Sequence, residues 1–390
     1  MTARKKIICY DDNPDYGGHQ VMACLAVEAL AKSANWNPVF FCNPKNIRLT
    51  SRLRGIQTLS ENLETRDAPF ATQKLQGLRN RFADASITKL ACLFERETPD
   101  LILCIQGEIE DGSLALCAAE RIAAPCISYI PVPHRMALMG AKFGAVRDML
   151  NEYLFKKPDG WITISESMKV LLRERGATAP VEVVPNGIDM ERFVPRDKNT
   201  ARAALGLPTG KTILGTIGRI EFNQKQQDFL LRTFFKHWKG DPSMHLMIVG
   251  DGPDRDRLDA LIRELGAQQQ VTLLPWQADS TLVYSAMDML VIPSRFEGVP
   301  LVMLEAIACG TPVVGSARDG MKDLLPANWT FQPENGEALA DTIRSVFKTW
   351  GTGFPALQAQ VRNDYTVNEF QRNFESALFR LLRSPGAVSR

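Results

Sequence analysis

Short runs of apolar residues alternate with amphipathic segments along almost the whole chain. In the first half the runs predict strands at Lys6–Tyr10, Pro38–Cys42, Leu101–Ile105, Cys126–Ile130, Trp161–Ile164 and Val181–Val184. In the second half they predict strands at Thr212–Ile217, His245–Val249, Val271–Leu274, Met289–Ile292 and Pro312–Val314. Segments with one apolar face predict helices between them, for example Gly18–Lys32, Gln227–Lys239 and Asp254–Leu265. Continuously apolar strands are typical of parallel sheets covered on both faces.

The alternation of strands and helices falls into two blocks. Such blocks predict an α/β fold with two Rossmann-like, doubly wound domains. Pro185 and Asn186-Gly187 mark a turn between the blocks, and a polar stretch follows at 196–202. We therefore expect an N-terminal domain over residues 1–185 and a C-terminal domain over residues 186–367. The last segment, Asn368–Leu382, has apolar positions at helical spacing.

Composition narrows the class of protein. The chain has 390 residues, 45% hydrophobic and 23% charged, with a net charge of +2, which is ordinary for a globular enzyme and gives no indication of a nucleic-acid partner. No apolar run approaches the length of a membrane span, and the start leads straight into a predicted strand, so we expect a cytoplasmic protein. The eight cysteines form no Cys-x-x-Cys pair, which predicts reduced core thiols and no metal site.

The stretch from Lys45 to Arg96 is the least regular part of the pattern. Its basic residues outnumber its acidic ones. The simplest interpretation is a solvated face of the protein. The alternative is a surface that meets an acceptor or an anionic membrane.

The most informative segment runs from Glu297 to Gly310. Pro300 favours a helix start, and Gly310 followed by Thr311-Pro312 favours a helix end. The residues between are apolar on all sides except Glu305, so the helix should be buried and this carboxylate should need hydrogen-bond donors. A ligand with hydroxyl groups would supply them.

The geometry of this segment points to a nucleotide sugar. The N–H groups near Val299, Pro300 and Leu301 lie at the positive end of the helix dipole, which suits a phosphate. Glu305 lies about 7 Å further along the axis, because each helical residue rises about 1.5 Å. We expect ribose toward Glu305 and hexose toward Glu297. The alternative is a buried helix whose Glu305 is satisfied by protein groups, with Glu297 in a surface loop.

Other residues follow predicted strands, where α/β sheets bind ligands. Arg219 ends one strand and Lys225 follows in the next loop, so the two cations would suit a diphosphate, although each could be a solvated surface residue. Gly17 and Gly18 precede a predicted helix and would let backbone N–H groups approach a phosphate, or would form a plain turn. They lack the Gly-x-Gly-x-x-Gly pattern of dinucleotide-binding proteins.

Three further candidates also follow strands. The glycines of the segment 249–253 favour a structural turn. Trp276 is expected either to form a wall of a base pocket or to belong to the core. His134 ends a first-domain strand and is either structural or a hydrogen-bond partner of a sugar hydroxyl or the acceptor.

Taken together, these motifs resemble glycosyltransferase family 4, which are retaining enzymes of the GT-B fold. The matching elements, in order and spacing, are Gly17-Gly18, Val184–Asp189, Gly218-Arg219 with Lys225, Gly250–Pro253, Pro293-Ser294, Glu297 with Glu305, and Gly310–Val314. The resemblance is strongest over about residues 180–320 and weak over 45–96. It implies two Rossmann-like domains facing a cleft. The first would be the acceptor side, with the C-terminal segment 368–390 packing back on it, and the second would bind the nucleotide sugar.

The resemblance also implies roles for individual residues. Arg219 and Lys225 look like the diphosphate contacts, Glu305 like the ribose contact, and Glu297 like the residue that touches the donor hexose. His134 looks like the cleft histidine near the transferred sugar. Such enzymes need no bound metal or cofactor, because cations and a helix dipole can stabilise the departing diphosphate. The acceptor would be a glycan or a lipid-linked glycan, and such enzymes commonly build cell-surface polysaccharide in peripheral contact with the inner face of the membrane.

Two departures from the family pattern affect this interpretation. The usual glycine after the lysine is replaced by Gln226, a change expected to alter the loop around Lys225. The family's Gly-Gly-x-x-Glu stretch reads Asp319-Gly-Met-Lys-Asp323. Three alternative functions stay open: a nucleotide-sugar epimerase of the same fold, a non-catalytic nucleotide-sugar-binding protein and, more weakly, a nicotinamide dehydrogenase.

Overall fold

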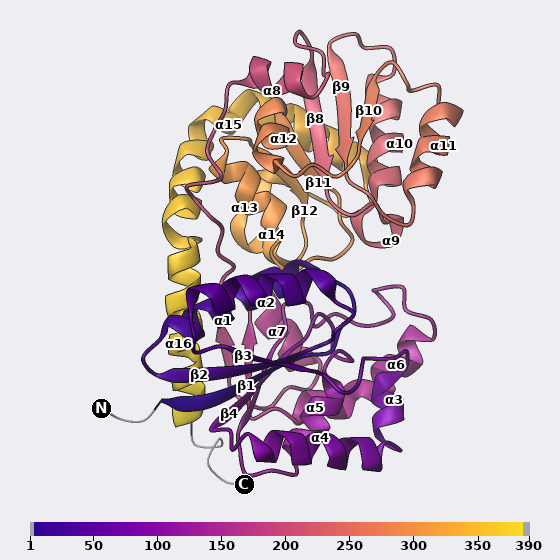
Figure 1. The fold of residues 1–390 in the computed structure, drawn as a ribbon. Helices are drawn as coiled ribbons and strands as arrows, with labels where there is room; N and C mark the ends of the chain where they lie inside the picture. The colour runs from indigo at the N-terminus through magenta and orange to yellow at the C-terminus, as the bar shows by residue number, and fades with distance from the viewer. Residues whose placement is uncertain (1–3, 385–390) are drawn as a thin grey trace. The chain divides into compact units, whose positions relative to one another are not determined.

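The computed structural model describes residues 4–384, which cluster into two compact units (Figure 1). Unit 1 contains the chain up to Gly187 and the segment that begins at Asn368, and unit 2 is Ile188–Val367. The chain therefore passes from one unit to the other twice. Residues 1–3 of the predicted first domain, and 385–390 of the predicted last segment, lie outside the described residues.

Unit 1 is built on a seven-stranded sheet in which every pairing is parallel. Its strands are β1 Lys5–Asp11, β2 Trp36–Cys42, β3 Glu64–Asp67, β4 Leu101–Ile105, β5 Cys126–Tyr129, β6 Gly160–Thr163 and β7 Val181–Val183, in the spatial order β3-β2-β1-β4-β5-β6-β7. The apolar runs predicted all of these strands except β3. That strand reads Glu-Thr-Arg-Asp, and it lies at the sheet edge, where charged side chains discourage pairing with another chain.

Helices connect these strands. They are α1 Gly18–Lys32, α2 Ile47–Leu59, α3 Gln76–Asn80, α4 Asp84–Arg96, α5 Ser113–Ala119, α6 Gly144–Asn151, the 3₁₀ helix η1 Glu152–Lys156, α7 Glu166–Glu174 and α16 Val367–Arg383. Three of them and β3 fall within the stretch 45–96. This stretch is therefore more regular than its sequence pattern predicted.

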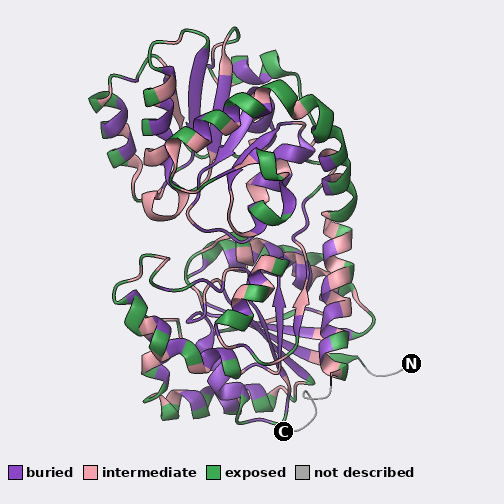
Figure 2. Ribbon diagram, turned by 180° about the vertical axis from the view of Figure 1, so that it is seen from behind, coloured by how far each residue is buried: buried purple, intermediate pink, exposed green. Residues whose placement is uncertain are grey.

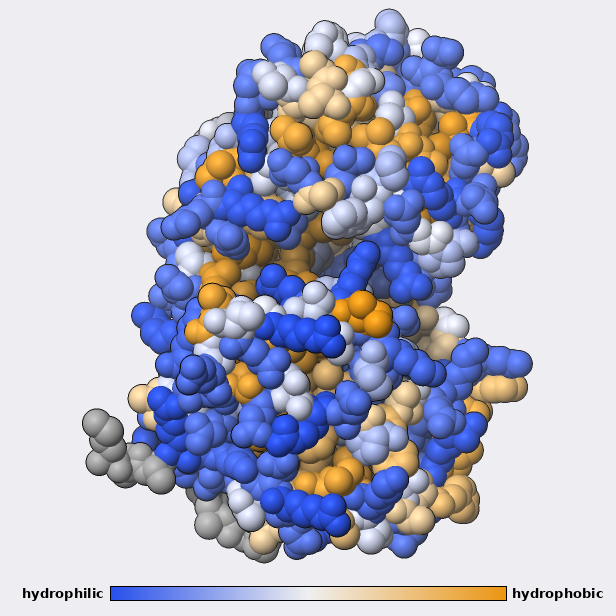
Figure 3. Space-filling model, in the orientation of Figure 1, coloured by the Kyte–Doolittle hydropathy of each residue, from blue (hydrophilic) through white to orange (hydrophobic). Residues whose placement is uncertain are grey.

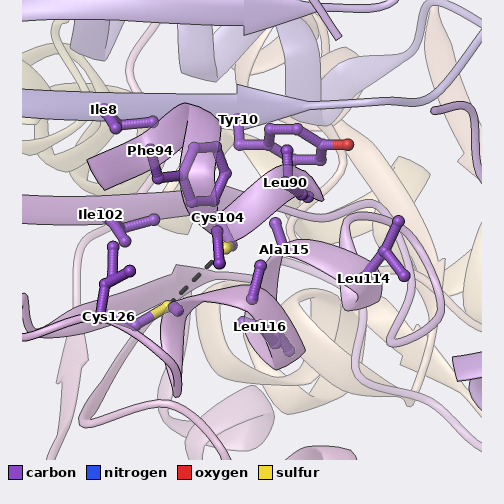
Figure 4. Packing of buried hydrophobic residues seen from close by; sticks show 14 of the residues in the cluster. Ile8, Tyr10, Leu90, Phe94, Ile102, Cys104, Leu114, Ala115, Leu116 and Cys126 are labelled. Atoms are coloured by element: carbon purple, nitrogen blue, oxygen red, sulfur yellow. Dashed lines mark hydrogen bonds between the residues drawn. The ribbon is translucent and has the colours of Figure 1, made fainter. Parts of the chain in front are cut away.

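A cluster of apolar side chains fills the space between the sheet of unit 1 and its helices (Figure 4). Tyr10 of β1 meets Phe94 of α4 edge to face, with ring centroids 5.7 Å apart. The sulfur atoms of Cys104 and Cys126, on neighbouring strands, lie 3.7 Å apart. All eight cysteines are free and only Cys92 is exposed, which agrees with the prediction of core thiols.

The last helix, α16, packs onto unit 1. Phe374 meets Tyr129 of β5 with ring centroids 5.7 Å apart, and Phe379 lies 5.3 Å from Trp36 of β2. The Nε atom of Arg380 donates a hydrogen bond to Glu182 of β7 at 2.9 Å. Side chains from the end of the chain therefore complete a core that begins with its first strands.

Unit 2 is built on a six-stranded sheet, again with every pairing parallel. Its strands are β8 Thr212–Ile217, β9 Met244–Val249, β10 Val271–Leu274, β11 Met289–Ile292, β12 Val313–Ser316 and β13 Thr330–Phe331, in the order β10-β9-β8-β11-β12-β13. Its helices are α8 Lys198–Ala204, α9 Phe222–Lys225, α10 Gln227–Trp238, α11 Arg255–Glu264, α12 Ser280–Ala286, α13 Leu301–Ala308, α14 Asp319–Leu324, the 3₁₀ helix η2 Ala327–Trp329 and α15 Gly336–Asp364. The strands are buried, whereas the helices expose one face (Figure 2).

The strand order of each sheet reverses at one point. In unit 1 the reversal lies between β1 and β4, and in unit 2 between β8 and β11. Open α/β sheets bind ligands beyond the carboxyl ends of the strands at such a point. The loops that follow these four strands are therefore the places to look for a site.

Candidate active site

The two loops at the reversal point of unit 2 meet through an ion pair. The loop after β8 leads into α9, which ends at Lys225, and the loop after β11 carries Glu297. Lys225 Nζ donates a hydrogen bond to Glu297 Oε1 at 2.5 Å. The lysine side chain is 24% exposed and the glutamate side chain 8%. The structure thus brings together two residues, 72 positions apart, that the sequence predicted for one site.

Glu297 is also held through its backbone. Its N–H donates to the Asp319 carboxylate at 2.8 Å, and the N–H of Gly320 donates to the carbonyl of Gly298 at 2.9 Å. The start of α14 therefore braces the loop that carries Glu297. From the sequence, the Asp319–Asp323 stretch was predicted only as a departure from the family pattern, and this positioning role of Asp319 was not predicted.

Helix α13 follows this loop. Pro300 is its N-cap, with φ −61° and ψ 123°, so the helix begins one residue later than expected, at Leu301. Because proline has no N–H, the amides of Leu301 and Val302 are the first-turn donors for which the helix itself provides no acceptor. Gly310, with φ 84°, follows the C-terminus as predicted.

Glu305, on α13, has a protein donor. The hydroxyl of Tyr284 on α12 donates to Glu305 Oε2 at 2.5 Å. Burial raises the pKa of Glu305, and the Tyr284 hydrogen bond opposes that rise. One oxygen of this carboxylate therefore has a protein donor, as expected under the alternative in which protein groups satisfy Glu305. A ribose contact stays a prediction.

Arg219 and Trp276 are exposed at the same edge of the sheet. The Arg219 side chain is 64% exposed, and its Nε lies 3.5 Å from a Glu221 oxygen. Its backbone carbonyl accepts a hydrogen bond from the Gln227 amide at 2.9 Å, which ties the loop after β8 to α10. Trp276 follows β10 and is 63% exposed, so the interpretation of this residue as core is wrong.

The loop around Lys225 contains a strained residue. Gln226 has φ 52° and ψ 41°, in the left-handed region that glycine adopts most easily. Its side-chain amide donates to Glu334 at 3.2 Å, and Glu334 also accepts from Arg295 Nε at 2.8 Å. The backbone at this position therefore has a conformation that favours glycine, although the larger Gln226 occupies it.

The turn after β9 packs directly against the loop after β8. Gly250 has φ 146°, and a Cβ atom there would lie 1.9 Å from the carbonyl oxygen of Gly218. The backbones of the two loops are therefore close enough to exclude any side chain. This supports the structural role predicted for the glycines of 249–253.

In unit 1, the predicted candidates follow β1 and β5. Gly17 caps α1, and its N–H donates to the Gln20 side chain at 2.6 Å. Gly18 is exposed, and a Cβ atom there would have nothing within 4 Å, so packing does not explain the glycine. His134 is 4% exposed in the segment after β5. All parallel strands of a sheet end at one edge, so these residues lie toward the same edge of unit 1.

A group of carboxylates that was not predicted from the sequence lies at the reversal point of unit 1. Asp12, directly after β1, accepts hydrogen bonds from the Thr72 hydroxyl at 2.5 Å and the Gly112 N–H at 2.9 Å. Asp111, after β4, accepts one from the Asn13 amide at 3.0 Å. Burial raises the pKa of Asp12 to about 7 and that of Asp111 to about 6.

Two more titratable groups lie nearby, Glu108 in the loop after β4 and His19 in the first turn of α1. Burial raises the pKa of Glu108 to about 8 and lowers that of His19 to about 4. A carboxyl group with a raised pKa, such as that of Glu108, can exchange a proton near neutral pH, whereas the His19 imidazole is neutral there. The sequence signal was available, because Asp11-Asp12 and Glu108–Asp111 directly follow predicted strands.

Two parallel, doubly wound sheets, one with a lysine–carboxylate pair at its reversal point, place the protein in the GT-B class of α/β folds. Solved structures support this class. One is HepE of Anabaena, in complex with UDP and glucose, with a TM-score of 0.77 at 18% identity over 97% of this chain and 100% of that chain. Another is a sucrose-phosphate synthase of Thermosynechococcus elongatus, with a TM-score of 0.77 at 21% identity over 97% and 99%.

The chain belongs to glycosyltransferase family 4. The model described as Glycosyltransferase Family 4 matches residues 16–192, and the one described as Glycosyl transferases group 1 matches residues 211–349. Among curated relatives, a D-inositol 3-phosphate glycosyltransferase of Mycobacterium sp. (strain KMS) is 41% identical over 174 residues, or 43% of this chain. One of Mycobacterium leprae (strain TN) is 37% identical over 167 residues, or 41% of this chain. The matched segment spans 38% of the length of each relative.

Among residues 4–384, no helix combines the length and the apolar character that crossing a bilayer requires.

Proposed function

We propose that the protein is a retaining, metal-independent glycosyltransferase that moves a hexose from a nucleotide diphosphate sugar to a hydroxyl acceptor. The observation that carries the proposal is the Lys225–Glu297 pair at the reversal point of unit 2, directly before the N-terminus of α13. A buried carboxylate held against a partly exposed cation is a site that a polar, anionic ligand can enter by exchanging partners. The complexes of the fold neighbour HepE with UDP and with UDP-glucose support this donor class.

The diphosphate would be bound by cations and backbone amides. Lys225 would turn from Glu297 to a phosphate oxygen, and the exposed guanidinium of Arg219 would add a two-pronged contact. The N–H groups of Val299 and Leu301 belong to the start of α13, where the helix dipole favours an anion. Together these groups would stabilise the negative charge that develops as the nucleoside diphosphate leaves, so no metal is required.

The two ends of the donor would meet carboxylates. Glu297, released from Lys225, would accept hydrogen bonds from hexose hydroxyls, and Glu305 would accept them from the ribose through the oxygen that Tyr284 leaves unused. The exposed indole of Trp276 would form a wall for the base. These contacts orient the sugar's anomeric carbon toward the acceptor.

In the transfer step, the bond between the anomeric carbon and the diphosphate oxygen breaks, and the acceptor oxygen bonds to that carbon from the same face. Because the new bond forms on the face that the diphosphate leaves, the configuration is retained, and the acceptor proton passes to a phosphate oxygen of the leaving group. His134 would hydrogen-bond a hydroxyl of the transferred sugar, and the backbone of Gly17 and Gly18 would contact phosphate or sugar. For the acceptor, we propose a glycan or lipid-linked glycan, and the relatives' names make inositol phosphate a second candidate to test.

The experiment combines donor binding with product detection. A thermal-shift panel of nucleotide sugars identifies the donor, because a ligand that binds the folded state raises its stability. Transfer is then measured with wild-type protein, with Glu297→Gln and with Lys225→Met. The matched control is Lys236→Met, which removes an exposed ion pair with Glu337 in the same unit. We expect both site variants to lose transfer and the control to keep it.

Three outcomes would overturn the proposal. Full turnover in both site variants would exclude the assigned roles. A rearranged or hydrolysed donor, with no transfer to any acceptor in a broad panel, would indicate an epimerase. Calorimetric donor binding without any product would indicate a sensor. Where transfer occurs, the anomeric configuration of the product, read by nuclear magnetic resonance, tests the retaining step separately.

A further inference from the structure

Among the described residues of unit 2, three residues other than glycine have a left-handed backbone. They are Gln226 with φ 52°, Asp319 with φ 49° and Glu334 with φ 60°. Side chains strain the backbone in this region, and such strain persists only where the surrounding structure imposes it. The three residues lie between α9 and α10, at the start of α14 and after β13. Despite this separation, all three are linked to the loop 293–299, which carries Glu297 and which we call the Glu297 loop.

The links between the strained residues and the Glu297 loop are hydrogen bonds. The Asp319 carboxylate accepts the backbone N–H of Glu297 at 2.8 Å. Glu334 Oε1 accepts Arg295 Nε at 2.8 Å, and the Gln226 amide donates to the same oxygen at 3.2 Å. The side chain of each strained residue therefore either binds the loop or holds a residue that binds it.

Further hydrogen bonds hold the first part of the Glu297 loop. The N–H of Arg295 donates to the carbonyl of Gln224 at 2.8 Å, and its guanidinium donates to the side-chain oxygen of Asn223 at 3.1 Å. The carbonyl of Ser294 accepts the Ser316 hydroxyl at 2.7 Å. The loop is thus clamped by segments on both sides of it.

Burial makes this clamp difficult to release. Hydrophilic side chains cover much of the surface in the view of Figure 3, where water can satisfy them. The Glu297 loop differs, because all of its residues are buried except Arg295, which is partly buried. A buried polar group without a partner is costly, so the loop cannot change its conformation without breaking several of these hydrogen bonds at once.

The clamp matters to the site because the Glu297 loop leads directly into α13. The loop contains Glu297, for which we propose the hexose contact, and it ends at Val299, for which we propose a phosphate contact through the N–H group. A displacement of the loop would move both groups together. Small displacements of groups that position a substrate can cost large factors in rate.

We propose that Gln226, Asp319 and Glu334 are positioning residues that hold the Glu297 loop ready for the nucleotide sugar, at a cost in stability. This inference rests on the proposed function, since it concerns the donor site. A loop that is ordered before binding loses less conformational entropy when the donor binds. Relieving the strain should therefore stabilise the fold and weaken the activity, a trade-off that is typical of functional sites.

The test compares glycine variants at strained positions inside and outside the clamp. Gln226→Gly and Asp319→Gly relieve strain and remove a clamping side chain. Asp319→Asn is the conservative variant, because asparagine tolerates the left-handed backbone and its side-chain oxygen can accept the same N–H. The matched control is Thr98→Gly, since Thr98 has φ 46° and is exposed after α4 in unit 1.

Three quantities are measured for each protein: the melting temperature, the kcat/KM of transfer, and the hydrogen exchange of the Arg295 and Glu297 amides. Gln226→Gly should melt above wild-type protein and yet lose about tenfold in kcat/KM, with faster exchange in the loop. Asp319→Gly should lose as much or more, and Asp319→Asn should recover most of the loss. Thr98→Gly should keep the wild-type kcat/KM and exchange rates.

The outcomes separate this inference from the proposed function. If wild-type protein transfers sugar and the two glycine variants in the clamp do so equally well, the inference fails and the proposed function stands. An equal loss in Thr98→Gly would also overturn it, because strain relief at any position would then be the cause. If wild-type protein transfers no sugar, the proposed function fails, and unchanged exchange in the glycine variants would show that these residues do not hold the loop either.

Discussion

Replacing Lys225 by methionine would leave Glu297 as a charge without its partner. The glutamate side chain is only 8% exposed, and its Oε1 lies 2.5 Å from the lysine nitrogen. Removing one partner of a buried ion pair costs about 3–5 kcal/mol. Because the lysine is partly exposed, we expect Lys225→Met to lower the free energy of unfolding of unit 2 by about 3 kcal/mol, at the low end of that range.

The double variant Lys225→Met/Glu297→Gln separates stability from function. Without the carboxylate there is no unpaired charge, so most of the lost stability should return, whereas transfer should stay abolished because both ligand contacts are gone. A structural ion pair would show the same recovery of stability but would leave transfer intact in the double variant.

Hydrogen exchange of the unit 2 strands, measured over a range of urea concentrations, reports the stability of that unit separately from unit 1. Wild-type, both single variants and the double variant complete the cycle. If the double variant is no more stable than Lys225→Met, the unpaired carboxylate is not the cause of the loss and the reasoning fails. Adding the donor should stabilise wild-type by mass action and the double variant far less.

Three further changes test other parts of the structure. Gln226→Gly should raise the free energy of unfolding by about 1 kcal/mol, because a left-handed backbone strains glutamine; a thermal melt checks this. Tyr284→Phe should destabilise the protein by about 1–3 kcal/mol, and more at pH 8 than at pH 5, because a charged Glu305 loses its donor. For Asp12, the folded-state pKa of about 7 exceeds the unfolded one, so wild-type loses stability as pH rises from about 4 to about 7. Urea titrations across this pH range should show that Asp12→Asn abolishes this part of the decline in stability. The part amounts to at most about 4 kcal/mol.

The strands of the fold could be predicted because nearly all of them are buried on both faces. Leu101–Ile105 and Thr212–Ile217 appear in the structure with the predicted bounds, since strands covered on both faces of a parallel sheet form nearly continuous apolar runs. The edge strands β3 and β13 were missed. The first is charged and the second has two residues, so neither forms an apolar run.

The candidate site was only partly predictable. Spacing after strands identified Lys225 and Glu297, because sheet topology brings such loops together regardless of their separation in sequence. The brace from Asp319 to the Glu297 backbone depends on a tertiary hydrogen bond that no local pattern encodes.

The two passages of the chain between the units have a consequence for synthesis. The N–H of Ile188 donates to the carbonyl of Tyr365 at 2.8 Å, so the first and last residues of unit 2 lie side by side. Unit 2 is thus an insertion within unit 1, and all of its residues have left the ribosome before α16 has. The core of unit 1 is therefore incomplete during synthesis, because Trp36 and Tyr129 stay uncovered until Phe379 and Phe374 of α16 have been made. The half of the protein that is made first should therefore be the last to finish folding.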